Sequence, residues 1–197
     1  MVKLGVFYCC DNELELKVLG LKTFFKSKCI YHKYIDHPVH STVYVFNIDL
    51  NNFENMVSDF LELRNTLLPV IVLIEKWKVF EKDIMTGLNT LCLEINLTNQ
   101  LKLVQLEIVN ALSKYHLKTD DINYTGELLN SQNAYGYPFI GNHWLPHITI
   151  GSLDLKTKLI SELCKDKFNF PTEIKINNLN LYIIQDDSHE LIEKIKF

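Results

Sequence analysis

The spacing of apolar residues along the chain changes repeatedly between that of helices and that of strands. Apolar residues three to four positions apart predict helices over residues 13–26, 52–64, 99–116 and 155–167. Shorter apolar or alternating runs predict strands over residues 3–9, 42–50, 70–80, 91–97, 147–153, 172–176 and 179–185, with a short final element over 191–197. The expected caps of the last three helices are Asn51 or Asn52, Thr98 or Asn99, and Asp154. This mixture of elements predicts an α+β fold.

The regular pattern breaks between Lys118 and His143, which we expect to form one long loop. The stretch is rich in turn-forming and aromatic residues: Gly126, Gly136, Pro138, Gly141, Tyr124, Tyr135, Tyr137 and Phe139. Long loops inside compact domains are usually functional or disordered, and the aromatic content argues against disorder. We therefore expect this loop to lie near a functional site.

Two strand-like segments far apart in the chain carry the same pattern, His-x-Thr followed by an apolar residue. The first begins at His40 in HSTV, and the second begins at His147 in HITI. Only these two of the seven histidines are followed in this way by Ser or Thr and an apolar residue. Residues i and i+2 of a strand lie on the same face. We therefore expect His40 beside Thr42, and His147 beside Thr149.

Two imidazoles with hydroxyl neighbours suit in-line phosphoryl chemistry in which no metal takes part. One imidazole takes a proton from the attacking oxygen, and the other gives a proton to the leaving oxygen. The threonine hydroxyls can hydrogen-bond the phosphate oxygens on which negative charge develops. We interpret the four motif residues as catalytic: His40, Thr42, His147 and Thr149. The pattern leaves open which histidine is the base.

The longer string around the second histidine, WLPHITIGSL, resembles the second signature of the 2H phosphoesterase superfamily. This superfamily includes RNA 2',3'-cyclic phosphodiesterases, historically called 2'-5' RNA ligases. The resemblance extends in order over most of the chain, from the His40 segment through Pro146-His147 to the closing run NLNLYIIQ. The first segment departs from the family pattern, because Val39 separates the proline from His40 and Ser41 stands where an apolar residue is usual.

The resemblance implies a single two-lobed domain over residues 1–197, with two mostly antiparallel sheets facing a central cleft and helices outside. Each wall of the cleft would carry one motif, which would bring both histidines to one phosphate. The order of motif strand, capped helix and returning strand occurs in both halves of the chain and agrees with two similar lobes. In the second motif strand, Ile148 and Ile150 would enter a core. Gly151 on the cleft face would leave room for substrate.

Large aromatic residues near the motifs are candidates for stacking on a base of the substrate. Tyr44 follows Thr42 in the first motif strand, and three more precede the second motif: Tyr135, Tyr137 and Trp144. The phosphate and its ester oxygens are common to all candidate substrates. We therefore expect these four aromatic residues to bind substrate and to discriminate among nucleotides.

The net charge narrows the class of substrate, and the cysteine count bears on disulfides and structural zinc. The net charge is −4 and Arg64 is the only arginine, so no run of basic residues forms the face that proteins gripping long RNA usually show. This favours a small nucleotide, an oligonucleotide or an RNA end as substrate. The five cysteines are an odd number without a Cys-x-x-Cys pair, so we expect reduced thiols rather than disulfides or a structural zinc site.

No segment of the sequence has the pattern of a signal peptide or a membrane anchor. The apolar run near the N-terminus is too short for a secretory signal. The longest apolar stretch, Leu67 to Ile74, is far below spanning length and contains Pro69. We expect a soluble cytoplasmic monomer that does not bind a membrane.

The leading hypothesis is a metal-independent phosphodiesterase that needs no cofactor and cleaves a cyclic or linear nucleotide phosphodiester. Candidate substrates are a 2',3'-cyclic phosphate, a 2',5'-linked oligonucleotide and a cyclic oligonucleotide signal. One alternative is a catalytically silent module of the same fold that binds or sequesters a nucleotide. Another is a histidine metallohydrolase, which His37 and His143 near the motifs suggest. No Asp, Glu or Cys with ligand spacing accompanies these two histidines, so we expect no metal.

Overall fold

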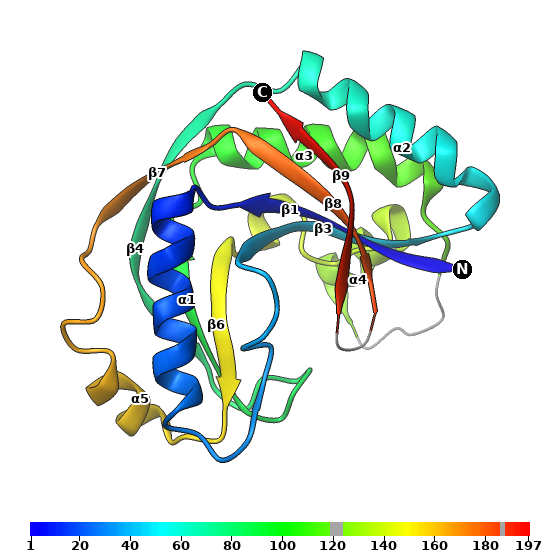
Figure 1. Ribbon diagram of the computed structural model, residues 1–197. Coiled ribbons are helices and arrows are strands. Elements are labelled where there is room, and N and C mark those ends of the chain that lie inside the picture. Colours follow the sequence, from blue (N-terminus) through cyan, green and yellow to red (C-terminus); the bar gives the residue numbers. More distant parts are fainter. Residues whose placement is uncertain (119–123, 186–187) are drawn as a thin grey trace.

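The computed structural model describes residues 1–118, 124–185 and 188–197, and Figure 1 shows a curled sheet with helices packed along it. The strands are β1 (Val2–Cys9), β2 (His32–Lys33), β3 (His40–Ile48), β4 (Val70–Phe80), β5 (Asn89–Ile95), β6 (His147–Leu153), β7 (Thr172–Ile176), β8 (Asn178–Ile184) and β9 (His189–Lys196). The helices are α1 (Asn12–Lys26), α2 (Phe53–Glu62), α3 (Asn99–Leu112), α4 (Gly126–Tyr135) and α5 (Thr157–Leu163). The predicted α+β class is confirmed.

The strands form one antiparallel sheet in the order β7-β4-β5-β6-β3-β1-β8-β9, and β2 pairs with β6. The two central strands, β3 and β6, share a single backbone pair, Ser41 with Ile148, whereas the other neighbours in this order share longer ladders. The two sheets expected from the sequence are thus the two halves of this sheet, joined at one point. We call this junction of β3 with β6 the seam.

Helices pack against both halves of the sheet (Figure 1). α1 packs against β6, while α2 and α3 pack together and reach β9 and β3. α1 begins after Asp11, whose Oδ1 accepts a hydrogen bond from Leu14 N at 2.9 Å. α3 begins after Thr98, whose Oγ1 accepts from Leu101 N at 3.1 Å. These side chains satisfy backbone donors that have no partner within the helix.

A buried polar residue of α3 connects the helix to both motif regions. Gln105 Nε2 donates to Val43 O at 3.0 Å and to Phe139 O at 2.9 Å. Its Oε1 accepts from Gly141 N at 2.8 Å, and the residue is fully buried. A buried side-chain amide that forms hydrogen bonds to three backbone groups fixes the positions of those groups. Gln105 therefore holds the segment before the second motif against the first motif strand.

The stretch from Lys118 to His143 is not one long loop, because residues 126–135 of it form α4. α4 ends at Gly136, whose φ of 71° is the left-handed conformation common at helix ends. The helix buries none of its residues, so it leaves no helical period of apolar positions in the sequence. Residues 119–123 of the predicted loop lie outside the described residues.

One further prediction about an element is wrong. Asp154 does not cap α5, which begins at Thr157; its Oδ2 instead accepts a hydrogen bond from Tyr31 N at 3.1 Å. The strand after α2, β4, pairs with β5 and β7 and not with the motif strand β3. Neither half of the sheet is therefore built from one continuous half of the chain.

None of the helices in the described part of the chain is both long and apolar enough to cross a membrane. All five cysteines are free thiols, as expected from their number.

Candidate active site

The four residues of the two His-x-Thr motifs lie together at the seam. The backbone pair that joins β3 to β6 falls between the histidine and the threonine of each motif. The antiparallel register then sets His40 opposite Thr149. It sets Thr42 opposite His147 in the same way. Because residues on either side of this pair share a face, the two histidines and the two threonines lie on the same face of the sheet at the seam.

Each histidine ring is held by a backbone carbonyl two residues before it. His40 Nδ1 lies 2.8 Å from Pro38 O. His147 Nδ1 lies 2.6 Å from Leu145 O. A carbonyl oxygen only accepts, so Nδ1 carries the proton of the neutral ring and Nε2 keeps a free lone pair. Nε2 of either ring can therefore take a proton as a base or, once protonated, give one as an acid.

His40 lies among aromatic rings and basic groups. Its ring is stacked on that of Phe7 with centroids 4.0 Å apart, and the His189 ring lies 5.5 Å away. Burial lowers the pKa of His40 to about 3, although the hydrogen bond to the carbonyl acts in the opposite direction. The charges of His189, Lys22 and His37 lower this pKa further. His40 is therefore neutral in the free protein near neutral pH.

His147 lies among acidic groups. Burial lowers its pKa, but the bonded carbonyl and the carboxylates of Asp83 and Glu94 raise it. Glu94 is paired with His147 across β5 and β6, and its Oε2 lies 3.5 Å from Lys76 Nζ. The Phe80 ring packs against His147 at a steep angle with centroids 5.4 Å apart. The two histidines thus have the same backbone support and neighbours of opposite charge.

Of these charged neighbours, sequence reasoning considered only His37, and only as a possible metal ligand. They come from α1, the segment before β3, β9, the β4–β5 turn and β5: Lys22, His37, His189, Asp83 and Glu94. One of them left a signal in the sequence. Lys22 falls on the apolar side of α1, four residues after Val18 and three before Phe25, where a lysine is unusual.

The two threonines are partly exposed on the same face as the histidines. Thr149 Oγ1 lies 3.8 Å from the Sγ of Cys92, which is fully buried on β5. A thiol is a weak hydrogen-bond partner. The Thr149 hydroxyl therefore keeps its capacity to bind a phosphate oxygen.

Tyr44 does not bind substrate as predicted, because its side chain is fully buried. Its ring stacks on Phe46 with centroids 4.5 Å apart, and its hydroxyl donates to the carbonyl of Tyr135. The register between β1 and β3 shifts between Thr42 and Tyr44, which is a β-bulge. The bulge breaks the alternation that would have placed Tyr44 beside Thr42.

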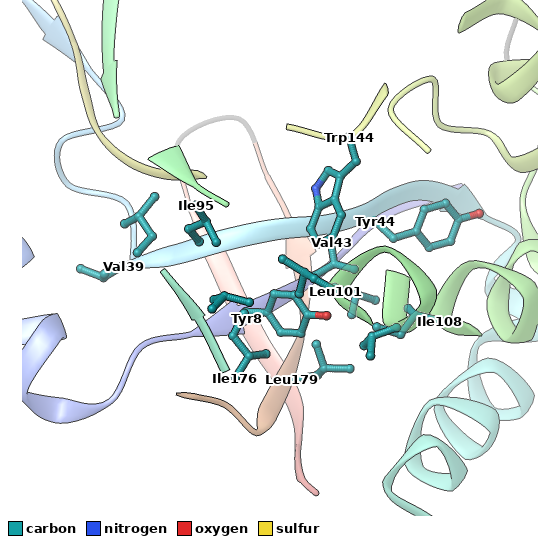
Figure 2. Close-up of a cluster of buried hydrophobic side chains, with 14 of the residues drawn as sticks. Tyr8, Val39, Val43, Tyr44, Ile95, Leu101, Ile108, Trp144, Ile176 and Leu179 are labelled. Carbon is teal, nitrogen blue, oxygen red and sulfur yellow. The ribbon is translucent and has the colours of Figure 1, made fainter. Parts of the chain in front are cut away.

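Trp144 is also buried, at 2% exposure, so the prediction that it stacks on a base is wrong. Tyr44 and Trp144 are both drawn in the core cluster of Figure 2. Trp144 Nε1 donates to Thr42 O at 2.9 Å, which ties the segment before the second motif to the first motif strand. Tyr135 and Tyr137 are partly buried against the core, and their contact with substrate stays a prediction.

Gly151 does not leave room for substrate. A Cβ atom at this position would lie 2.3 Å from Ile35 Cγ1, and Ile35 is only 3% exposed. The glycine instead lets the segment before β3 pack closely on β6. Ile148 and Ile150 are buried in the core, as predicted.

His37 and His143, the two histidines considered as metal ligands, contact other side chains. His143 Nε2 lies 2.6 Å from Glu127 Oε2, and the His37 ring lies 4.5 Å from that of His189. Among residues 1–118, 124–185 and 188–197, no three His, Cys, Asp or Glu side chains are grouped so as to hold a metal ion.

The sequence matches no family model and no curated protein. The fold matches solved structures over nearly their whole length. TT0787 of Thermus thermophilus has a TM-score of 0.65 at 12% identity, covering 98% of this chain and 97% of that one. A phosphoesterase has a TM-score of 0.57 at 7% identity, covering 100% and 98%. E. coli LigT in complex with 3'-AMP has a TM-score of 0.57 at 8% identity, again covering 100% and 98%. At these identities the likeness is one of fold, and it confirms the fold that the resemblance implied.

Proposed function

We propose that the protein is a metal-independent phosphodiesterase of the 2H type, with His40 and His147 as acid and base on a nucleotide phosphodiester. The observation that carries the proposal is the pair of histidines at the seam, each with Nδ1 held by the carbonyl two residues before it. Histidines with only a structural role would not need the same Nδ1 hydrogen bond in both motifs. An acid and a base, in contrast, both need a free Nε2 directed at the same substrate. The likeness of fold to a phosphoesterase and to LigT supports the same class of reaction.

Hydrolysis of a 2',3'-cyclic phosphate shows how the four residues would divide the work. The neutral histidine takes a proton from water while the water oxygen bonds to phosphorus. The protonated histidine gives its proton to the ribose oxygen as that P–O bond breaks, which leaves a phosphate monoester and a free hydroxyl. Thr42 and Thr149 hydrogen-bond the nonbridging oxygens, and exchange with solvent restores both rings. In a linear 2',5' or 3',5' diester the neighbouring ribose hydroxyl would attack, giving a cyclic phosphate.

The proposed substrate is a small nucleotide, an oligonucleotide or an RNA end. A net charge of −4 is unsuited to holding long RNA through its phosphates. E. coli LigT forms complexes with 3'-AMP, NADP+, ATP and phosphate, so this fold admits nucleotides and free phosphate in that protein. We propose further that the protein acts as a cytoplasmic monomer without a cofactor.

Asparagine in place of each histidine tests this proposal. Its amide can donate to the same carbonyl as Nδ1, but it has no counterpart of Nε2 for proton transfer. We expect His40→Asn and His147→Asn each to lower turnover on the order of 10²-fold or more, with little change in melting temperature. His116→Asn is the matched control, because His116 Nδ1 also bonds a carbonyl, Ser113 O at 2.6 Å, away from the seam. Its turnover should equal that of the wild type.

The assay uses 2',3'-cyclic mononucleotides, 2',5'- and 3',5'-linked dinucleotides and a cyclic dinucleotide, with products separated by chromatography and assigned by phosphorus NMR. Unchanged turnover by a folded His147→Asn variant would refute the acid–base role. Activity lost on addition of EDTA would favour a metallohydrolase instead. Tight nucleotide binding without products would favour the silent binding module.

A further inference from the structure

Lys22 of α1 is a buried charge. It is 3% exposed and lies on the side of the helix that also buries Val18 and Phe25. Burying an ammonium group is costly unless hydrogen bonds or an opposite charge compensate it. Lys22 Nζ donates to two backbone carbonyls, Tyr34 O at 3.2 Å and His37 O at 3.0 Å. Across the described residues it forms no ion pair, so its partners are these carbonyls.

The two carbonyls belong to the turn that leads into the first motif. His37 N donates to Tyr34 O at 3.2 Å, and Tyr34 has a φ of 65°, which is uncommon for a residue with a side chain. The next carbonyl along the chain, Pro38 O, accepts from His40 Nδ1 at 2.8 Å. Lys22 and the His40 ring therefore hold consecutive carbonyls of one backbone segment.

The charge of Lys22 also acts on the His40 ring. It lowers the pKa of His40 together with His189 and His37, in addition to the larger effect of burial. These three basic groups face the ring from α1, from β9 and from the turn, and no acidic group is among the causes that set this pKa.

Lys22 itself titrates close to neutral pH. Burial lowers its pKa to about 8, while Asp36 and Cys92 act in the opposite direction. Asp36 belongs to the same turn, but its carboxylate pairs with Lys26 Nζ at 2.7 Å on the exposed side. Lys22 is therefore charged at neutral pH and loses its charge as the pH rises through about 8.

We propose that Lys22 is a positioning residue for His40: it anchors the turn whose next carbonyl orients the ring, and its positive charge adds to the effect of burial in disfavouring a protonated ring, so that His40 is the base. His147 is then the acid: burial lowers its pKa, but Asp83 and Glu94 oppose this effect, whereas the charges beside His40 add to it. The acid and base roles rest on the proposed function. The effect of Lys22 on the protonation of His40 is a property of the free protein and is measured without turnover.

The ring protons of His40, assigned by their loss in His40→Asn, report this effect in an NMR titration. In the wild type we expect His40 to stay neutral well below pH 6.5, the usual pKa of histidine, and to show a second, small inflection near pH 8 as Lys22 loses its proton. Lys22→Arg keeps the charge at all accessible pH values, so this second inflection should disappear. This comparison needs no variant that leaves the buried carbonyls without a donor.

Lys22→Met removes the charge and both hydrogen bonds. We expect the apparent pKa of His40 to rise by about half a unit or more, since a positive charge nearby has been lost. Lys26→Met is the matched control, because Lys26 contacts the same turn through Asp36 from the exposed side of the segment. It should leave the His40 titration unchanged. An equal shift in both variants, or a wild-type curve without the second inflection, would overturn the proposal.

Kinetics test the catalytic part separately. The acidic limb of the rate profile reports protonation of the base, so Lys22→Met should move this limb to higher pH and lower kcat more than it changes KM. Lys26→Met should do neither. If the NMR shifts occur but the protein turns over none of the phosphodiesters, the proposed function fails while the role of Lys22 stands. If turnover follows the His→Asn predictions but the acidic limb does not move, the proposal for Lys22 fails alone.

Discussion

Replacing Trp144 with phenylalanine tests whether the two motifs are held in register by a hydrogen bond through the core. Trp144 Nε1 donates to Thr42 O at 2.9 Å, and the side chain is 2% exposed. Phenylalanine keeps most of the ring but removes the donor. A buried carbonyl left without its partner costs about 1–3 kcal/mol, and the smaller ring adds about 1 kcal/mol of lost packing. We therefore expect the free energy of unfolding to fall by about 2–4 kcal/mol, measured by urea denaturation.

Trp77→Phe is the control for this measurement. Trp77 lies on β4 and packs at a steep angle against Phe168 and Phe170, with ring centroids 6.1 and 5.7 Å apart. Within the described residues its N–H has no acceptor, so only the packing loss of about 1 kcal/mol applies. The difference between the two variants isolates the hydrogen bond from the change in ring size.

Turnover should fall with stability in the Trp144→Phe variant. Thr42 and His147 lie next to the one backbone pair that joins β3 to β6, so a shift of β3 against β6 moves one proposed catalytic group relative to another. We expect kcat to fall about tenfold with KM little changed, because misplacement by a fraction of an ångström acts on the chemical step. Equal stability of the Trp144→Phe and Trp77→Phe variants would refute the hydrogen-bond argument. A rise in KM confined to substrates that carry a base would instead restore the stacking role expected from the sequence.

Two further predictions concern other groups near the seam. Gly151→Ala should lower the free energy of unfolding by about 1–3 kcal/mol, because its Cβ would meet Ile35 Cγ1. In a protein that already carries Ile35→Ala, the same Gly151→Ala change should cost less, because the atom that it would meet is gone. A double-mutant cycle by urea denaturation that shows independent, additive losses would contradict the contact. Glu94→Gln removes a carboxylate that raises the pKa of His147, so the alkaline limb of the rate profile should move to lower pH. Glu54→Gln on α2 is the control for this variant. If the alkaline limb stays in place in both variants, His147 is not the acid whose ionisation this limb reports.

The local elements and the motif residues could be predicted because their signals are periodic. The alternation along β6 places His147 and Thr149 on one face and two isoleucines in the core, as the structure has them. The register between β3 and β6 could not be read from either segment, because it depends on a single pair between strands far apart in the chain. The family resemblance supplied that juxtaposition, and the structure places the motifs accordingly.

Tyr44 and Trp144 were misjudged because closeness in sequence was taken for closeness to the substrate. The β-bulge in β3 turns Tyr44 into the core, and Trp144 enters the core from the other motif region. Both carry polar atoms that bond backbone carbonyls, which is the usual requirement for burying tyrosine and tryptophan. A buried lysine on the apolar side of α1 was the more informative signal, because a charge in that position needs a specific partner.

The duplicated motifs raise a question that their own residues do not answer. Each histidine has the same backbone hydrogen bond and a threonine two residues after it, so the motifs alone describe two equivalent groups. Phosphodiester cleavage needs inequivalent groups, one neutral and one protonated, when substrate arrives. Burial lowers the pKa of both rings, and the charges that differ between them belong to residues outside the motifs: Lys22, His37 and His189 beside His40, and Asp83 and Glu94 beside His147. If acidic residues lay beside the first histidine and basic residues beside the second, we would expect the two histidines to exchange the roles of acid and base. The charged neighbours, and not the motifs, would therefore set the direction of proton transfer.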